Sequence, residues 1–270
     1  MQTSSSRTRN QLIASAAATL EVLEALGSSD APLPLAAIVA LTGRPKGSVH
    51  RMVSTLVNTG FVQQDDASGR YSLTLKAWRI GASAIRRLDL VERARPILDR
   101  LVGATGETVH LAVLDPSGGV VYVAKVESPK SIGVQTRLGQ MNPSWCTATG
   151  RSLLAFNVPI AERVLSCRLD KRTPKTITDP RVIRTRLAEV RTNGYAVTLA
   201  ENHPEMGGVA APVRDHDGVV VAALGVAIPQ YRMDAAATKR AIPNVLRAAS
   251  ELSHALGHHT VSKRSAVRAA

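Results

Sequence analysis

The sequence predicts an α+β protein with an N-terminal winged helix-turn-helix, a helical linker and a larger C-terminal domain in which helices flank an antiparallel sheet. Three observations support this prediction. The chain has 270 residues, which favours two domains because a single domain usually has about 100–200 residues. Apolar residues recur with a helical period over 12–58, and two short alternating segments follow within 61–73. From residue 107 onward the period changes from helical to alternating.

Three helices and a short hairpin are expected within residues 10–73. A glycine follows the end of each helix, and the last two helices are short and joined by a tight turn, as in a helix-turn-helix at about 34–56. The alternating segments join through the turn Asp65–Gly69, which completes a winged helix. The preceding residues 1–9 are Ser-rich and basic, and are either an arm on DNA or a frayed terminus. We place the helices at 12–26, 35–42 and 44–59, with Pro45 in the first turn of the third, and the strands at 60–64 and 70–73.

The third helix has a polar face without acids. Apolar residues recur from Val49 at i+3, i+4 and i+7, and the opposite face has hydroxyls, Arg51 and no carboxylate. A helix exposed only to water usually mixes both charge signs, whereas a helix in the DNA major groove excludes acids beside phosphates. This favours a DNA-reading helix over an ordinary solvated one. The candidate DNA contacts are Arg44, Pro45, Lys46, Ser48, Arg51, Ser54 and, in the wing, Arg70.

The remaining chain reads as a helical linker at 74–88 and an α+β domain at 89–257. Turn sequences rich in Asp and Gly predict hairpins after residues 114 and 213. Residues 258–270 read as a basic, loose tail. Expected strands lie at 108–114, 120–126, 132–136, 195–199, 208–213 and 219–228. Expected helices lie at 75–104, 147–156, 161–167 and 235–256, and a further helix follows the polar turn at 173–180 and ends at 193.

Composition limits the partners and the compartment. The net charge is +13 and the pI about 10.5, which points to a polyanion such as nucleic acid. Two cysteines form no disulfide framework, the start has no secretory pattern, and no apolar run reaches the length of a membrane span. We therefore expect a cytoplasmic protein with no membrane partner.

Motifs for catalysis or cofactor binding are missing. The sequence has no Gly-x-Ser-x-Gly, phosphate-binding loop or dinucleotide fingerprint. Cys146 and Cys167 are 21 positions apart, unlike paired zinc ligands, and His203-Pro-Glu205 has no second ligand pair. We expect no catalytic residue, no metal and no cofactor.

Several segments resemble the IclR-type bacterial transcription regulators. GRPKGSVHRMVSTLVNTGFV and GRYSLTLKAWRIG are similar to that family's winged helix, and TGETVHLAVLD, PSWCTATGRSLLAF, AENHPEMGGVAAPV and GVVVAALGVAIP to its second domain. Two departures are Gly150-Arg151 where the family usually has Gly-Lys, and Ala200-Glu201-Asn202 where it usually has Glu-Glu-Asn. The resemblance implies a GAF-like effector domain, a double-stranded DNA operator and a homo-oligomer, either a dimer or a dimer of dimers. It also implies that the linker pairs across a dimer, whereas the apolar pattern equally allows packing within one chain.

The resemblance also implies an effector site. Because the implied strand wall has few polar side chains, we expect a larger, aromatic or apolar carboxylic acid, with its carboxylate at the Thr149 helix start. A vestigial pocket filled by Trp145 is the alternative. A second reading of the whole chain is a GAF-like ligand-binding or enzymatic domain whose winged helix serves protein contacts. The implied effector residues are Trp145, Cys146, Thr147, Ala148, Thr149 and Gly150 in the loop, and Leu199, Glu201, Gly208, Gly225 and Ala227 opposite.

Overall fold

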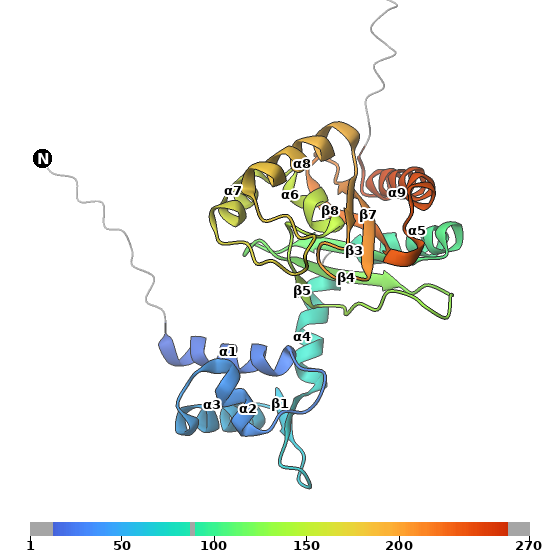
Figure 1. The fold of residues 1–270 in the computed structure, drawn as a ribbon. Helices are drawn as coiled ribbons and strands as arrows, with labels where there is room; N and C mark the ends of the chain where they lie inside the picture. Colours follow the sequence, from blue (N-terminus) through green and yellow to red (C-terminus); the bar gives the residue numbers. More distant parts are fainter. Residues whose placement is uncertain (1–12, 87–89, 259–270) are drawn as a thin grey trace, which may run out of the picture. The chain divides into compact units, whose positions relative to one another are not determined.

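The computed structural model describes residues 13–86 and 90–258, which divide into two compact units at the 87/88 boundary (Figure 1). This boundary falls within the predicted linker. The predicted arm at 1–9 and all but the first residue of the predicted tail at 258–270 lie outside the described residues.

The first unit is a winged helix-turn-helix, as predicted. Val22, Ile38, Val49 and Val53 come from three helices and are almost fully buried in one core. Gly43 has a φ of 63°, a left-handed conformation that ends the second helix and makes the tight turn to the third. Its elements are α1 (Ala14–Gly27), α2 (Leu35–Thr42), α3 (Lys46–Asn58), β1 (Val62–Gln64), β2 (Tyr71–Leu73) and α4 (Leu75–Arg86).

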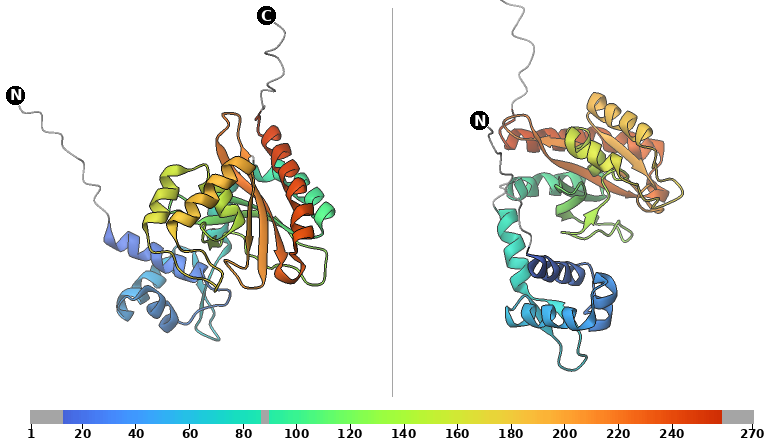
Figure 2. Two further views of the ribbon diagram at one scale, coloured as in Figure 1. Left: turned by 45° about the horizontal axis from the view of Figure 1, so that its top comes forward. Right: turned by 90° about the vertical axis from the view of Figure 1, so that its left-hand side faces the viewer.

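The second unit is an antiparallel six-stranded sheet in the order β5-β4-β3-β8-β7-β6, with helices on both faces (Figure 2). Helices α5 and α9 pack on one face with Val209, whereas α6, α7 and α8 pack on the other with Ala210. The neighbouring residues of one strand thus enter different cores, as the pleat requires. The elements are α5 (Leu90–Thr105), β3 (Thr108–Leu114), β4 (Val120–Val126), β5 (Met141–Asn142), α6 (Ala148–Leu154), α7 (Val158–Ser166), α8 (Pro180–Asn193), β6 (Ala196–Leu199), β7 (Met206–Arg214), β8 (Val220–Pro229), the 3-10 helix η1 (Gln230–Arg232) and α9 (Ala235–Ala255).

One predicted strand is wrong. Residues 132–136 are irregular, and the strand on the outer side of β4 is the short β5 at Met141–Asn142, inside a predicted loop. Side chains hold the irregular segment: the Thr108 hydroxyl donates to the Val134 carbonyl, and the Lys125 ammonium to the Thr136 carbonyl. These bonds occupy main-chain carbonyls that a strand ladder would use, so the alternating pattern of this segment produces no strand.

Candidate nucleic-acid interface and effector cavity

Helix α3 presents the predicted polar face. Val49 and Val53 are buried under α1 and α2, whereas Lys46, His50 and Arg51 are exposed. Sequence reasoning did not select His50, although its exposure beside Arg51 makes it part of the same surface. Ser48 and Ser54 are half-buried, and the Ser54 hydroxyl donates to the His50 carbonyl at 2.9 Å.

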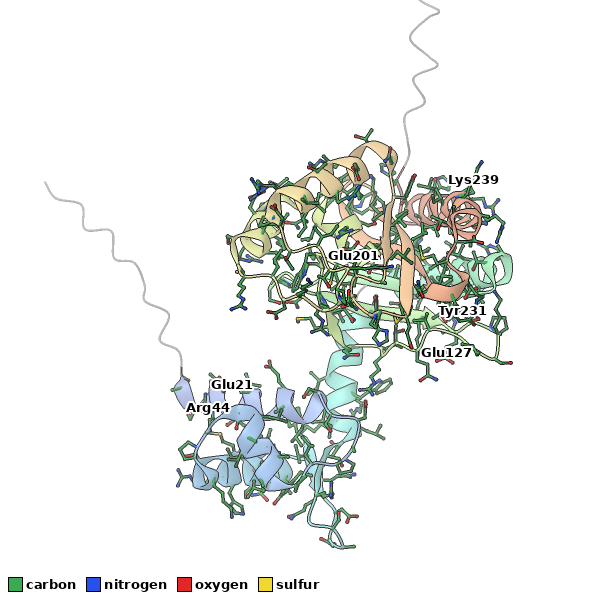
Figure 3. The ribbon with its side chains drawn as sticks, viewed as in Figure 1. Glu21, Arg44, Glu127, Glu201, Tyr231 and Lys239 are labelled. Atoms are coloured by element: carbon green, nitrogen blue, oxygen red, sulfur yellow. The ribbon has the colours of Figure 1, made fainter. Side chains whose placement is uncertain are left out.

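Three of the other predicted DNA contacts have local roles in the first unit. Arg44 forms an ion pair with Glu21 of α1, with 2.6 Å between Nη2 and Oε2, so an acid lies beside a surface predicted to have none (Figure 3). In the wing, Arg70 donates to the Pro32 carbonyl at 3.1 Å. Pro45 is the residue that caps α3, one position before the first turn in which we expected it.

The second unit contains a cavity between α6 and the sheet. It brings together seven of the eleven predicted effector residues, from the loop before α6, from α6 itself and from β7 and β8. These seven are Cys146, Thr147, Ala148, Thr149, Gly208, Gly225 and Ala227.

The other four predicted residues do not line this cavity. Leu199 and Glu201 line a separate hollow against α8, Trp145 packs in the core under α6, and Gly150 lies against the backbone of Ser144. Trp145 therefore does not fill this cavity, although the alternative of a vestigial pocket required it to do so. The error at Leu199 is one of strand register, because its neighbour Thr198 lines the cavity instead.

The sequence reasoning missed most of the polar lining. His110 of β3 and Tyr122 of β4 stack with 4.5 Å between ring centroids, and both line the cavity. The other missed polar residues are Thr198, Asn202 and His203. The prediction of a wall with few hydrogen-bonding partners is therefore wrong. Alternation along β3 and β4 was the available signal, but it required knowing which face of the sheet meets α6.

Burial fixes the protonation of two cavity groups. It lowers the pKa of His110 to about 3, with a smaller effect from the Lys125 ammonium, so the imidazole is neutral at pH 7 and hydrogen-bonds with Thr136. Burial, together with the Glu201 carboxylate, raises the pKa of Cys146 to about 12. A thiol that stays protonated is a poor nucleophile, so Cys146 has no chemical activation here.

One buried hydroxyl at the cavity makes no hydrogen bond of ordinary geometry. Thr149 Oγ1 is buried and has no such partner among the described residues, although it lies close enough to the Tyr122 phenol to oppose the rise in the pKa of that group that burial causes. The side chain of Thr147 caps α6 by accepting from the Gly150 N–H at 3.2 Å. The first two N–H groups of the helix, those of Ala148 and Thr149, have no acceptor within the helix. The α6 side of the cavity therefore offers donors to an anionic oxygen.

The cavity is smaller than the glycine-rich wall suggested. Its volume is about 50 Å³, compared with about 150 Å³ for a cavity that admits benzene. A methyl group added at Gly225 would lie 2.9 Å from Thr149 Cγ2, and one at Gly208 would lie 3.2 Å from the Val226 carbonyl. The glycines thus allow α6 and the neighbouring strand to approach closely, and leave no extra space for a ligand.

Arg151 and Glu201 form a buried ion pair outside the effector cavity. The Arg151 guanidinium is 2% exposed and donates to both Glu201 oxygens, with an Nη1–Oε1 distance of 2.8 Å, and its Nε donates to the Trp145 carbonyl. The backbone of Glu201 in turn accepts a hydrogen bond from Thr176. Glu201 therefore holds Arg151 and the loop before α6, and does not face the effector cavity.

The described part of the chain contains neither a candidate metal-ligand cluster nor a candidate membrane-spanning helix. No group of three or more His, Cys, Asp or Glu side chains within residues 13–86 and 90–258 is placed to hold a metal ion. No helix in these same ranges is both long enough and apolar enough to cross a membrane.

Comparisons with known proteins agree with this architecture. The IclR helix-turn-helix domain matches residues 15–66, and the bacterial transcriptional regulator IclR C-terminal domain matches residues 82–254. The HTH-type transcriptional regulator KdgR of Escherichia coli is 32% identical over 216 residues, which cover 79% of this chain and 82% of KdgR.

Solved structures are similar over most of the chain. An IclR transcriptional regulator from Alicyclobacillus acidocaldarius superposes with a TM-score of 0.79 at 29% identity, covering 92% of this chain and 100% of that one. An IclR homologue from Microbacterium hydrocarbonoxydans, complexed with 4-hydroxybenzoate, has a TM-score of 0.77 at 25% identity, covering 90% and 98%. The chain therefore belongs to the IclR family, and it is a DNA-binding transcription regulator with a C-terminal effector domain.

Proposed function

We propose that α3 reads the operator and that Arg51 contacts a base edge or the phosphate flanking it. The carrying observation is the exposed face of α3 with Lys46, His50 and Arg51 and no acid of its own. Lys46 and Arg70 contact phosphates. To do so, Arg70 gives up its hydrogen bond to the Pro32 carbonyl. Arg44 stays with Glu21 and orients the start of α3.

A homodimer places two copies of α3 on two half-sites, because one winged helix covers too little DNA for useful specificity. The exposure of two large apolar side chains on α4 supports this proposal: Leu75 is 78% and Trp78 is 67% exposed. Such residues favour pairing of α4 with another copy over packing within one chain. The protein acts in the cytoplasm, where its operator is.

The DNA proposal is tested with Arg51→Ala. A side chain that reads a base contributes about 1–3 kcal/mol, so the operator Kd should rise about 5- to 150-fold at fixed salt, with one operator position relaxed. Arg168→Ala is the matched control, because Arg168 is an exposed arginine of the second unit and its loss changes the net charge equally. Equal affinities for the Arg51→Ala and Arg168→Ala proteins would contradict the assignment.

The effector is a small carboxylic acid bound between α6 and the sheet, and its binding changes operator affinity. The Microbacterium homologue with bound 4-hydroxybenzoate supports an acid as the ligand class. The volume of about 50 Å³ and the polar lining favour a short, polar acid over the larger, aromatic or apolar acid expected from the sequence, because an aromatic ring would require the cavity to widen. The carboxylate accepts from the Thr149 hydroxyl and the first N–H groups of α6.

Calorimetry with pyruvate and benzoate tests the effector proposal. Pyruvate should bind at least tenfold more tightly than benzoate, and Ala227→Phe should abolish its binding because Ala227 lines the cavity. Val158→Phe, at an exposed position of α7, is the matched control and should bind pyruvate as the wild type does. Tighter binding of benzoate, or pyruvate binding that a Phe at 227 leaves unchanged, would contradict the proposal.

A further inference from the structure

The second unit has another hollow that shares no lining residue with the effector cavity. It is a groove of about 510 Å³ between the end of α5, the end of β8 with η1, and the first half of α9, where Figure 3 labels Lys239. Four cationic side chains and one carboxylate line it: Lys130, Arg232, Lys239, Arg240 and Glu107.

The inner wall of this groove is an ionic triad of Glu107, Lys130 and Arg232. The Glu107 side chain is 7% exposed, and it accepts from Lys130 at 2.7 Å and from Arg232 at 3.0 and 2.8 Å. Burial alone would raise the pKa of Glu107, but the two cations hold it below its ordinary value. The triad has a net charge of +1, and the carboxylate fixes both cationic groups in place.

The outer wall has positive charge without an acid. Lys239 and Arg240 of α9 are exposed, and neither has an ion-pair partner among the described residues. Several other exposed arginines of this unit are paired, as Arg184 is with Glu162. Asp234, five positions before Lys239 in the sequence, caps α9 by accepting from the Ala237 N–H. With Asp234 counted, the four cations and two acids leave a net charge of +2.

We propose that this groove binds a small organic anion with at least two negative charges. Its volume lies within the range of about 300–1,000 Å³ typical of ligand sites, which exceeds the space that a bare inorganic ion fills. Ile228, Ala237, Ala241 and Pro243 supply an apolar surface for the carbon skeleton. Cations from separate elements supply donors for separate anionic groups, in an arrangement that a monoanion does not satisfy.

Citrate binding to the full chain, measured by calorimetry, tests this proposal. Lys239→Gln/Arg240→Gln removes the outer cations and should weaken citrate binding about tenfold or more. Arg168→Gln/Lys171→Gln is the matched control, because it removes the same charge from exposed positions outside the groove and should leave citrate binding unchanged. Glu107→Gln removes the carboxylate that neutralises the inner cations and should tighten citrate binding. If this variant does not fold, the comparison of the two double variants tests the proposal.

Three outcomes would overturn the proposal. One is equal loss of citrate affinity in the two double variants, which would mean that only the overall charge matters. Another is binding of inorganic sulfate as tight as that of citrate at equal ionic strength, which would mean that the groove is a general anion surface. Citrate binding that Ala227→Phe abolishes would place the ligand in the effector cavity and would also refute the second site.

Discussion

Removing the charge of Glu201 should destabilise the effector unit strongly. Glu201→Gln keeps the shape of the side chain but leaves the 2%-exposed Arg151 guanidinium without a counterion. Breaking a buried ion pair of this kind costs about 3–5 kcal/mol, because the remaining charge keeps its desolvation penalty. We expect a loss of about 3 kcal/mol, since the Gln oxygen still accepts one hydrogen bond.

The chain offers a matched control and a local probe. Glu162→Gln breaks the exposed pair with Arg184, whose side chain is 46% exposed, and should cost less than about 1 kcal/mol. Of the two tryptophans, Trp78 is in the first unit, so the measurements use a Trp78→Phe background. Urea unfolding followed by Trp145 fluorescence then reports on the loop that Arg151 holds.

A double replacement tests whether the lost stability comes from the unpaired buried charge of Arg151 or from the lost contacts of Glu201. In Arg151→Met/Glu201→Leu no charge stays buried, so most of the lost stability should return. Two results would refute the reasoning. One is a loss of unfolding free energy in Glu201→Gln as small as that in Glu162→Gln, and the other is a double variant that is less stable than Glu201→Gln.

Two further predictions concern titration and salt. Because His110 titrates near 3 when folded and near 6.5 when unfolded, the unfolded state binds an extra proton between these values, so stability falls as pH falls from 6.5 towards 3. At pH 5 the free energy of unfolding should be about 2 kcal/mol lower than at pH 7 because of His110. In His110→Gln, the difference between the unfolding free energies at pH 7 and pH 5, measured in urea, should be smaller by that amount. An unchanged difference would contradict the assignment. Lys46→Gln and Arg70→Gln should each lower the slope of log K against log salt by roughly one and weaken specific and non-specific DNA alike; loss of specific binding alone, with the slope intact, would identify a base contact.

The hairpins and helices were predictable because their signals are local. The strands at 108–114 and 120–126 were predicted with the bounds that the structure has, since an Asp- and Gly-containing turn separates two alternating segments. The polar face of α3 was predictable for the same reason, from one helical period. The strand predicted at 132–136 is absent because the side chains of Thr108 and Lys125, which are distant in the sequence, donate hydrogen bonds to the carbonyls of this segment.

The cavity was less predictable because helices cover both faces of the sheet. Alternation then distinguishes two faces without indicating which one meets α6, so Leu199 was chosen in place of Thr198. His110 and Tyr122 were missed for the same reason. The role of Glu201 depends on a partner 50 positions away in the sequence, and no local pattern reports such a pair.

We propose that an acid bound in the second unit changes DNA binding by the first. The most direct test is the operator Kd of the full chain at fixed salt, titrated with pyruvate, for the wild type and for Ala227→Phe. We predict a change of about fivefold or more in the wild type, the lower end of typical allosteric coupling, and none in Ala227→Phe with its ligand-free affinity retained. An operator Kd that pyruvate leaves unchanged in the wild type, or changes equally in both proteins, would contradict the account.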